Sequence, residues 1–231
     1  MLLITSSDRC YISDLLEKLK YKKEDAPNGS EVYKASYNAH EFILLVTGYG
    51  KVNIGSSLRY ACEKYNVGAV ISTGTCGSIS DTNDIFSAII PNSSLEFDVD
   101  FTPNGYMAGQ IPKVNKAVYN TNDDLTDCLV SSCNKLGINY SNNVIASSDM
   151  FVSNYNLANS IRKEYNAGAV DTETGSIGQF CYINNISYAA IRVVSNFANN
   201  NGIKQYNLYD KQSSKISNKI IHEFLKEFYD E

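Results

Sequence analysis

The sequence predicts an α/β protein, folded as a three-layer αβα sandwich around a mixed central β-sheet. Short apolar runs alternate with amphipathic stretches of helical period along all 231 residues, which is the pattern of strands and the helices that cover them. Hydrophobic residues make up 43% of the chain, enough for a sizeable core. Only four prolines occur, and no Gly/Ser-rich linker or run of like charge divides the sequence. We therefore expect a single domain over residues 1–231.

The first elements are predicted from local period and turn residues. The apolar run at 2–5 predicts a strand, and the amphipathic stretch at 11–20 predicts a helix. A Pro-Asn-Gly turn at 27–29 precedes two alternating segments, 31–37 and 41–47. These two segments predict a β-hairpin.

The next elements lead to a glycine-rich segment. The stretch 52–65 predicts a helix, and the apolar run 67–73 predicts a buried strand. The sequence GTCGS at 74–78 is expected to end that strand in a turn. After a further strand at 85–91, the stretch 92–115 is irregular. Such a long loop in a compact protein is more often functional than idle.

The second half of the chain alternates strands and helices more regularly. This order implies a mixed sheet with helices on both faces. The predicted helices are 123–136, 157–164, 176–184 and 213–229, and the predicted strands are 144–147, 167–170 and 188–195.

Polar side chains follow two of these predicted strands. In an open α/β sheet, ligands bind beyond the carboxyl ends of strands, so side chains at two such ends are expected to share one crevice. The crevice would offer carboxylates for a sugar and amides for a base. The residues concerned are Asp171, Glu173, Ser195, Asn196 and Asn199.

Composition excludes several classes of partner. The formal net charge of −5 argues against a nucleic-acid backbone. No segment is apolar over the ~20 residues that a membrane span requires. The start of the chain, MLLITSSDRC, is typical of a first strand and not of a signal peptide, so cytoplasm is the expected compartment. The six cysteines and two histidines form no metal-like cluster, and we expect no metal ion.

Five segments together resemble a known family. They are TGYGKVN at 47–53, STGTCGSI at 72–79, DVDFTPNGYMAGQIP at 98–112, SSDMFV at 147–152, and the pair 169–177 with 189–199. The chain resembles the nucleoside phosphorylase and nucleosidase superfamily, most closely the 5′-methylthioadenosine/S-adenosylhomocysteine nucleosidases. The resemblance implies a nucleoside phosphorylase-like fold, cleavage of a purine nucleoside with release of adenine, and a cytoplasmic homodimer in methionine salvage. It implies no metal and no organic cofactor.

The resemblance also implies residue roles, beside which plainer readings stay open. By resemblance, Glu173 binds both ribose hydroxyls and Phe151 stacks on the base; by pattern alone they are a helix-start residue and a core aromatic. Other positions follow from the same motifs. Thr75 and Gly77 line the sugar, the Val152 backbone pairs with the base edge, Ser195 supports the base-binding loop, Tyr206 covers the 5′ end, and Tyr106 and Pro112 lie in a loop that reaches a partner subunit's site.

Three departures from the family bear on catalysis. Asn196 stands where the nucleosidases have an aspartic acid that protonates N7 of the purine; an amide contacts N7 but gives up no proton. Loss of general acid catalysis typically costs ~10²–10⁴-fold. Asp8 is the nearest carboxylate to the family's water-orienting glutamate, and it is the candidate base. Thr172 replaces a methionine that packs against the ribose.

Two other functions stay open at this point. In a phosphate-dependent purine nucleoside phosphorylase, Asn196 would suit the base and Arg9 would hold phosphate, although Ser72 stands where those enzymes have a second arginine. In a catalytically weak nucleoside-binding homologue, Phe151 and Glu173 would be retained while the acid and base are lost.

Overall fold

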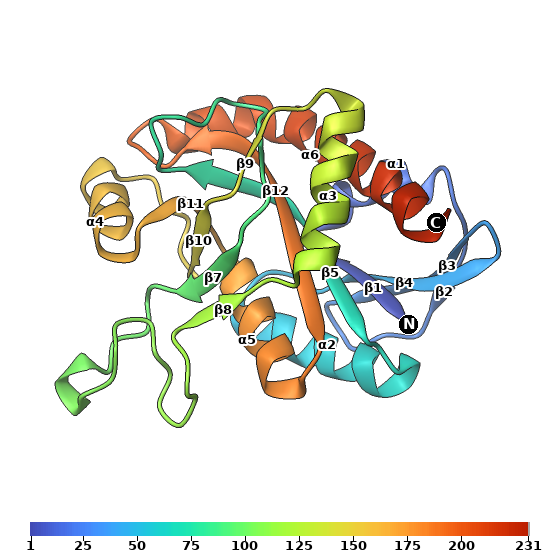
Figure 1. The fold of residues 1–231 in the computed structure, drawn as a ribbon, viewed down its shortest axis with the longest axis horizontal. Helices are drawn as coiled ribbons and strands as arrows, with labels where there is room; N and C mark the ends of the chain where they lie inside the picture. Colours follow the sequence, from blue (N-terminus) through green and yellow to red (C-terminus); the bar gives the residue numbers. More distant parts are fainter. Residues whose placement is uncertain (231) are drawn as a thin grey trace.

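Residues 1–230, which the computed structural model describes, form twelve strands in one mixed sheet (Figure 1). Hydrogen-bonded neighbours follow the order β2-β3-β4-β1-β5-β11-β10-β7-β8, while β12 joins β5 to β6 and β6 also pairs with β9. The strands are β1 (Leu2–Ser6), β2 (Lys20–Glu24), β3 (Glu31–Tyr37), β4 (His40–Val46), β5 (Ala69–Ser78), β6 (Ala88–Ile89), β7 (Ser93–Glu96), β8 (Val118–Asn120), β9 (Tyr140–Ser141), β10 (Val144–Ser147), β11 (Ala167–Asp171) and β12 (Ser187–Phe197).

The ten-residue strand β5 is the centre of this sheet. It pairs in parallel with β12 along its length and with β1 over its first half, and its end pairs antiparallel with β11. As a result, Gly77 of β5 lies between Val170 of β11 and Asn196 of β12. The polar ends of β11 and β12 therefore meet beside one glycine.

Helices cover both faces of the sheet, which confirms the predicted three-layer sandwich (Figure 1). On one face, α1 (Ser13–Leu16), α3 (Asp123–Leu136) and α6 (Gly202–Tyr229) share an apolar core with the strands. On the other face, α2 (Lys51–Tyr65) and α5 (Thr174–Asn184) form a second core. The remaining helix, α4 (Tyr155–Tyr165), packs against β10 and β11.

Capping residues explain why several bounds agree with the sequence pattern. The helix α3 has the predicted bounds because the Asn122 side chain accepts a hydrogen bond from the Leu125 N–H, and Gly137 ends the helix in the left-handed conformation. Asn154 caps the start of α4 in the same way, through the N–H of Leu157. Local side-chain chemistry is sufficient to place such ends.

Other predicted elements were wrong. The helix expected at 11–20 is a 3-10 turn (Arg9–Tyr11) and the four-residue α1, and the residues that follow form the edge strand β2 on β3. The strand expected to end at Gly74 continues to Ser78, because β12 and β11 supply hydrogen-bond partners throughout. Part of the expected 92–115 loop is β7, and α6 begins at Gly202, well before residue 213.

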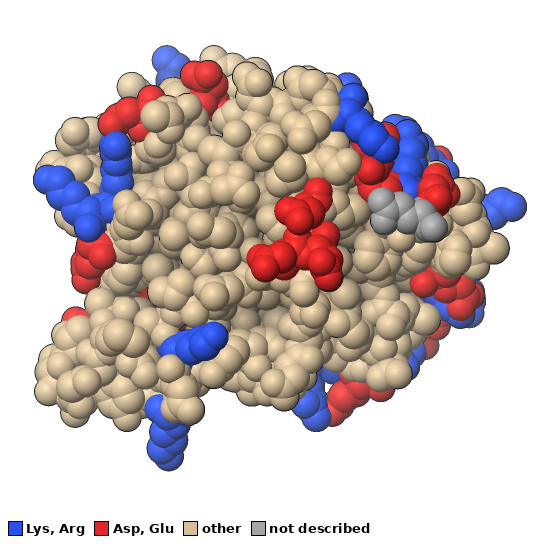
Figure 2. Space-filling model, in the orientation of Figure 1, with Lys and Arg blue, Asp and Glu red and all other residues tan. Residues whose placement is uncertain are grey.

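The surface and the loop between β7 and β8 complete the fold. This loop contains the 3-10 turn Thr102–Asn104 and extends away from the sheet in Figure 1. On the face shown in Figure 2, lysine and arginine side chains are scattered, and an acidic patch lies over α3, whose first turn contains Asp123 and Asp124. Within residues 1–230, no helix combines the length and the apolar character needed to cross a bilayer.

Candidate active site

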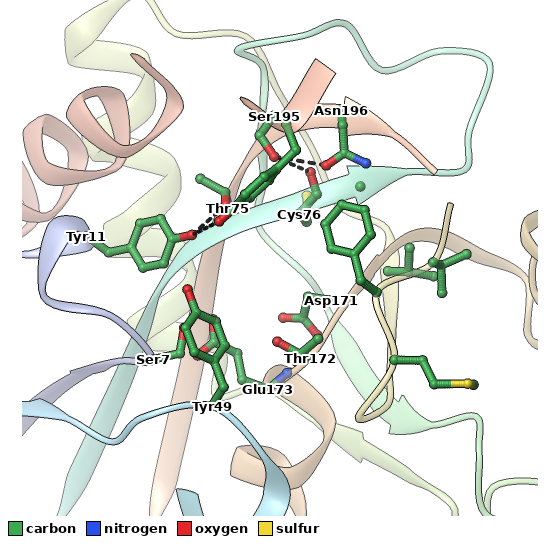
Figure 3. A pocket seen from close by; sticks show the side chains of 16 residues that line it. Ser7, Tyr11, Tyr49, Thr75, Cys76, Asp171, Thr172, Glu173, Ser195 and Asn196 are labelled. Carbon is green, nitrogen blue, oxygen red and sulfur yellow. Dashed lines mark hydrogen bonds between the residues drawn. The ribbon is translucent and has the colours of Figure 1, made fainter. Parts of the chain in front are cut away.

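One pocket collects the polar ends of β5, β11 and β12 together with residues from β1–η1, α6 and two loops (Figure 3). Most of the predicted substrate-binding residues line it: Thr75, Gly77, Phe151, Val152, Thr172, Glu173, Ser195, Asn196 and Tyr206. The other lining residues are Ser7, Tyr11, Tyr49, Cys76, Met150, Val170 and Asp171.

A buried charge network, which we call the pocket floor, consists of Asp171, Glu173 and Arg192. Arg192 is fully buried in β12, where its Nε donates to Asp171 Oδ2 at 2.8 Å and its Nη2 donates to Ser72 Oγ at 2.8 Å. The same Nη2 lies 3.3 Å from Glu173 Oε1. Two carboxylates around one guanidinium give the floor an excess of hydrogen-bond acceptors.

The two floor carboxylates differ in how fully they are bonded. Asp171 accepts hydrogen bonds from the hydroxyls of Ser147 and Thr174 and from the N–H groups of residues 173 and 174, besides Arg192. Glu173 Oε2 is buried and has no hydrogen-bond partner within residues 1–230. Burial raises the pKa of Glu173 to about 7, and Asp171 adds to the rise, while Arg192 and the hydroxyl and N–H of Ser7 lower it. Glu173 is therefore the floor group with an oxygen available for a ligand.

Gly74 makes room for this carboxylate. A Cβ atom at Gly74 would lie 2.9 Å from Glu173 Oε1 and 3.7 Å from Arg192 Nε. The side chains of the pocket floor occupy the space beside this glycine. The small residue in this strand therefore serves the close approach of a side chain.

The base side of the pocket contains Ser195, Asn196 and Phe151. Ser195 Oγ donates to Asn196 Oδ1 at 3.0 Å, and Asn196 Nδ2 donates to the Phe197 carbonyl at 3.2 Å. The serine and the asparagine are buried, whereas the Phe151 ring is 47% exposed and meets Tyr206 edge-to-face at 5.5 Å. A planar ligand thus has one aromatic face and a fixed amide in reach.

The opposite side is a cluster of hydroxyls around one carboxylate, which we call the tyrosine wall: Tyr11, Thr75, Tyr206 and Asp210. Thr75 Oγ1 donates to Asp210 Oδ1 at 2.7 Å, and the Tyr11 hydroxyl donates to the same oxygen at 3.2 Å. The hydroxyls of Tyr11 and Tyr206 are 3.4 Å apart. Burial raises the pKa of Asp210, while its hydrogen bonds to Thr75 and Tyr11 oppose that rise.

Several predicted residues lie outside the pocket lining. Asp8 caps the 3-10 turn by accepting from the Cys10 N–H at 2.9 Å, so its position gives no support to the predicted water-activating role. Arg9 stacks over Tyr33 at the surface and pairs with Glu31 at 3.9 Å, away from the place where phosphate was expected.

Asn199 does not join the crevice as expected. Its side-chain oxygen accepts from the Asn201 N–H and its carbonyl accepts from the Gly202 N–H, so it forms the turn that leads into α6. Tyr106 and Pro112 lie in the loop between β7 and β8 and do not line the pocket of their own chain.

Sequence reasoning missed several important groups. Arg192 stands inside an apolar strand, and a charged residue in such a run signals a buried partner; that signal was available. No such signal pointed to Tyr11 or Asp210, because the 3-10 turn η1 and the first turns of α6 were not predicted. Within the described residues, His, Cys, Asp and Glu side chains form no group of three or more arranged to hold a metal ion.

Comparisons with known proteins agree with this geometry. The family model of the phosphorylase superfamily matches residues 2–229. A 5′-methylthioadenosine/S-adenosylhomocysteine nucleosidase of Staphylococcus haemolyticus is 27% identical over 216 residues, covering 93% of this chain and 94% of its own.

Solved structures show the same fold. The Neisseria meningitidis 5′-methylthioadenosine/S-adenosylhomocysteine nucleosidase, in complex with methylthio-immucillin-A, superposes with a TM-score of 0.93 at 23% identity over 97% of this chain and 98% of that one. The futalosine hydrolase of Helicobacter pylori gives a TM-score of 0.93 at 22% identity over 98% and 97%. With a family model matched along nearly its whole length, the chain belongs to the phosphorylase superfamily.

Proposed function

We propose that this protein is a purine nucleoside N-ribosidase, a hydrolase that cleaves the N-glycosidic bond and releases the base. The observation that carries the proposal is the unpartnered, buried Glu173 Oε2 in a pocket that also holds Asn196 and Phe151. A carboxylate accepts two hydrogen bonds from a vicinal diol, and an aromatic ring with an amide suits a purine. The relatives that are named nucleosidases support the same activity.

The chemistry follows from where charge develops. Breaking the glycosidic bond leaves positive charge on the ribose and negative charge on the base. The net negative pocket floor, with Glu173 on the two ribose hydroxyls, stabilises the ribosyl cation. Asn196 donates a hydrogen bond to N7 and so stabilises the departing base without giving it a proton, while Ser195 holds the amide in place. Thr172, Gly77 and Val152 shape the remaining walls.

Water is the nucleophile in this proposal. The phosphorylase alternative is not favoured, because phosphate needs cationic donors. No lysine or arginine lines the pocket within residues 1–230, and Arg192 below it is already engaged by Asp171 and Ser72.

The proposed assembly is a homodimer in the cytoplasm. The loop with Tyr106 and Pro112 extends from the body of the chain, and an exposed Phe101 and Met107 lie on it. Apolar side chains on a projecting loop favour contact with a second copy, whose pocket this loop would reach.

The test is release of free base from adenosine, inosine, 5′-methylthioadenosine and S-adenosylhomocysteine, with and without phosphate, followed by chromatography. Release without phosphate is the expected result. Release only with phosphate would identify a phosphorylase, and tight binding without product would identify a nucleoside-binding protein.

A variant tests the role of the base-side amide. Asn196→Asp places an ionisable carboxyl beside Ser195, and we expect hydrolysis of 5′-methylthioadenosine to rise, by up to about 10²-fold, because a general acid contributes at least that much. Asn156→Asp, the same substitution at an exposed position of α4 outside the pocket, is the control. No gain would mean that water activation and not the acid limits the rate.

A further inference from the structure

The end of the pocket opposite Asn196 is polar, although it is built largely from aromatic residues. Figure 3 shows Tyr11 and Tyr49 on the side away from Asn196, with the Tyr49 hydroxyl directed toward Tyr11. Ser7 and Thr75 add two more hydroxyls to this region. An apolar substituent would face oxygen atoms from several directions here.

The geometry of a nucleoside fixes what reaches this end. The base is on C1′ and the 5′ carbon is on C4′, while the two ribose hydroxyls project from the opposite edge of the ring. With the base at Asn196 and the hydroxyls at Glu173, the 5′ group extends toward the tyrosine wall. This placement rests on the proposed function.

Proton counting shows what the tyrosine wall offers a ligand. Each of its hydroxyls has one proton, and those of Thr75 and Tyr11 point at Asp210 Oδ1. The Tyr206 hydroxyl lies 3.4 Å from that of Tyr11, and its hydrogen bond to Asp210 is one of the contacts that lower the pKa of that carboxyl. Asp210 therefore draws the protons of Thr75, Tyr11 and Tyr206 toward itself, and these three hydroxyls have oxygen lone pairs left for a ligand.

Among residues 1–230, the carboxylate of Asp210 also has no balancing cation. Asp210 takes part in no ion pair within residues 1–230, in contrast with Asp171. A 5′-phosphate would be repelled by this charge, and a thioether sulfur has no proton to donate. A 5′-hydroxyl can donate one hydrogen bond to an oxygen of the tyrosine wall.

We propose that the pocket selects purine nucleosides with a free 5′-hydroxyl group over those with a 5′-thioether or 5′-phosphate, and that Asp210 and Tyr206 determine this specificity. Tyr206 is the residue that meets the ligand, since it is half-buried between Phe151 and Tyr11. Asp210 is a positioning residue that acts through Tyr11 and Thr75.

The experiment compares kcat/KM for substrates that share base and ribose and differ only at the 5′ position: adenosine, 5′-deoxyadenosine, 5′-methylthioadenosine and adenosine 5′-phosphate, with inosine and 5′-deoxyinosine in parallel. Adenosine should exceed 5′-deoxyadenosine by about 10- to 100-fold, as expected for a hydrogen bond in a charged network. The 5′-methylthio and 5′-phosphate substrates should fall below adenosine.

Variants separate specificity from folding. Tyr206→Phe should bring the ratio of adenosine to 5′-deoxyadenosine close to one, because it removes the hydroxyl that meets the 5′ group. Asp210→Asn keeps the acceptor oxygen of Thr75 and Tyr11 but removes the charge, so it should lower the ratio, with a larger loss of kcat/KM for adenosine than for 5′-deoxyadenosine. Tyr209→Phe, on the same helix but packed on Phe86, should keep the ratio and is the matched control. A merely structural role for Asp210 would lower both substrates together.

The outcomes separate failure of the 5′-hydroxyl proposal from failure of the proposed N-ribosidase activity. Cleavage of 5′-methylthioadenosine at or above the rate for adenosine, unchanged in Asp210→Asn, would overturn the 5′-hydroxyl proposal and leave the N-ribosidase intact. If no substrate is cleaved, the proposed N-ribosidase activity is wrong. Calorimetric Kd values for adenosine and 5′-deoxyadenosine then test the 5′ preference. Equal Kd values, or no binding of either, would overturn it.

Discussion

The pocket floor and the tyrosine wall both place carboxylates beside the same cavity, but they balance the charge in different ways. In the floor, the fully buried Arg192 joins Asp171 and Glu173. In the wall, Asp210 accepts hydrogen bonds from hydroxyls and has no ion pair within the described chain. Arg192 lowers the pKa of Glu173 against the effect of burial, and its removal would leave two buried carboxyl groups without a cation. The hydroxyls of the wall donate hydrogen bonds to Asp210 but carry no positive charge. The floor is thus paired by charge, and the wall by hydrogen bonds alone.

The largest effect is expected from breaking the floor. Arg192→Met leaves two carboxylates buried without a cation and Ser72 without its donor, which should lower the free energy of unfolding by about 3–5 kcal/mol. Thermal denaturation should show a drop in Tm of about 10 °C for a chain of this size. Arg162→Met, which breaks an exposed ion pair with Asp81, is the control and should change Tm little. Equal shifts in both variants would show that the floor is not a stabilising network.

Activity should depend most on the unpartnered oxygen of the floor. Glu173→Gln keeps the shape of the side chain but replaces one acceptor oxygen with a donor, so one ribose hydroxyl loses its partner and the cation loses its counter-charge. We expect kcat/KM for nucleoside cleavage to fall about 100-fold or more. Glu164→Gln, on the exposed side of α4, is the control. A loss below about threefold would remove Glu173 from the proposed ribose site.

The pH dependence of substrate binding should report the ionisation of Glu173 in the floor. Because burial raises the pKa of Glu173 to about 7, the ionised form that binds ribose increases as pH rises through that value. The KM for a nucleoside should therefore fall about tenfold between pH 6 and pH 8, in proportion to the ionised fraction. The sign for stability is opposite: since the folded-state pKa lies above the ordinary value of 4.5, this group's contribution is present below pH 4.5 and lost as pH rises through 7. The KM of Glu173→Gln should be flat over the same range.

The smallest effect is expected from removing charge in the wall. Asp210→Asn keeps an oxygen that accepts from Thr75 and Tyr11, and it removes a carboxylate whose pKa burial has raised. The free energy of unfolding should change by less than about 1 kcal/mol. Because the folded-state pKa of Asp210 is raised, any gain in the variant should appear as the pH rises through that pKa. Chemical denaturation over a series of pH values measures this. A loss comparable to that of Arg192→Met would erase the difference between the two regions.

Elements with local signals were predicted well. The helix α3 and the strand β10 have the expected bounds, since a capping asparagine, a terminal glycine and a short apolar run each act within a few residues. The pocket residues at the ends of β11 and β12 were also predicted, because the carboxyl end of a strand can be located from the apolar run in the sequence. Their roles remain predictions.

Elements that depend on distant partners were missed. The edge strand β2 has exposed lysines and, among the described strands, pairs only with β3, so nothing in its own five residues distinguishes it from a helix. The GTCGS segment looked like a turn because its two glycines disfavour a strand. The strand persists because β11 and β12 supply hydrogen-bond partners as far as Ser78. The glycines are required because Glu173 occupies the space beside Gly74, and Asn196 Nδ2 lies 3.0 Å from where a Cβ of Gly77 would be.

The sequence by itself determined the fold class, the superfamily resemblance and the carboxylate and amide at the ends of two strands, since these depend on period and motif. Only the tertiary structure decided that Arg192 lies beneath both carboxylates, that one oxygen of Glu173 is left unpartnered, and that Asp210 meets Tyr11 across 199 positions of the chain. The physical reason is that pKa, hydrogen-bond satisfaction and charge balance depend on neighbours in space, which local sequence patterns do not encode.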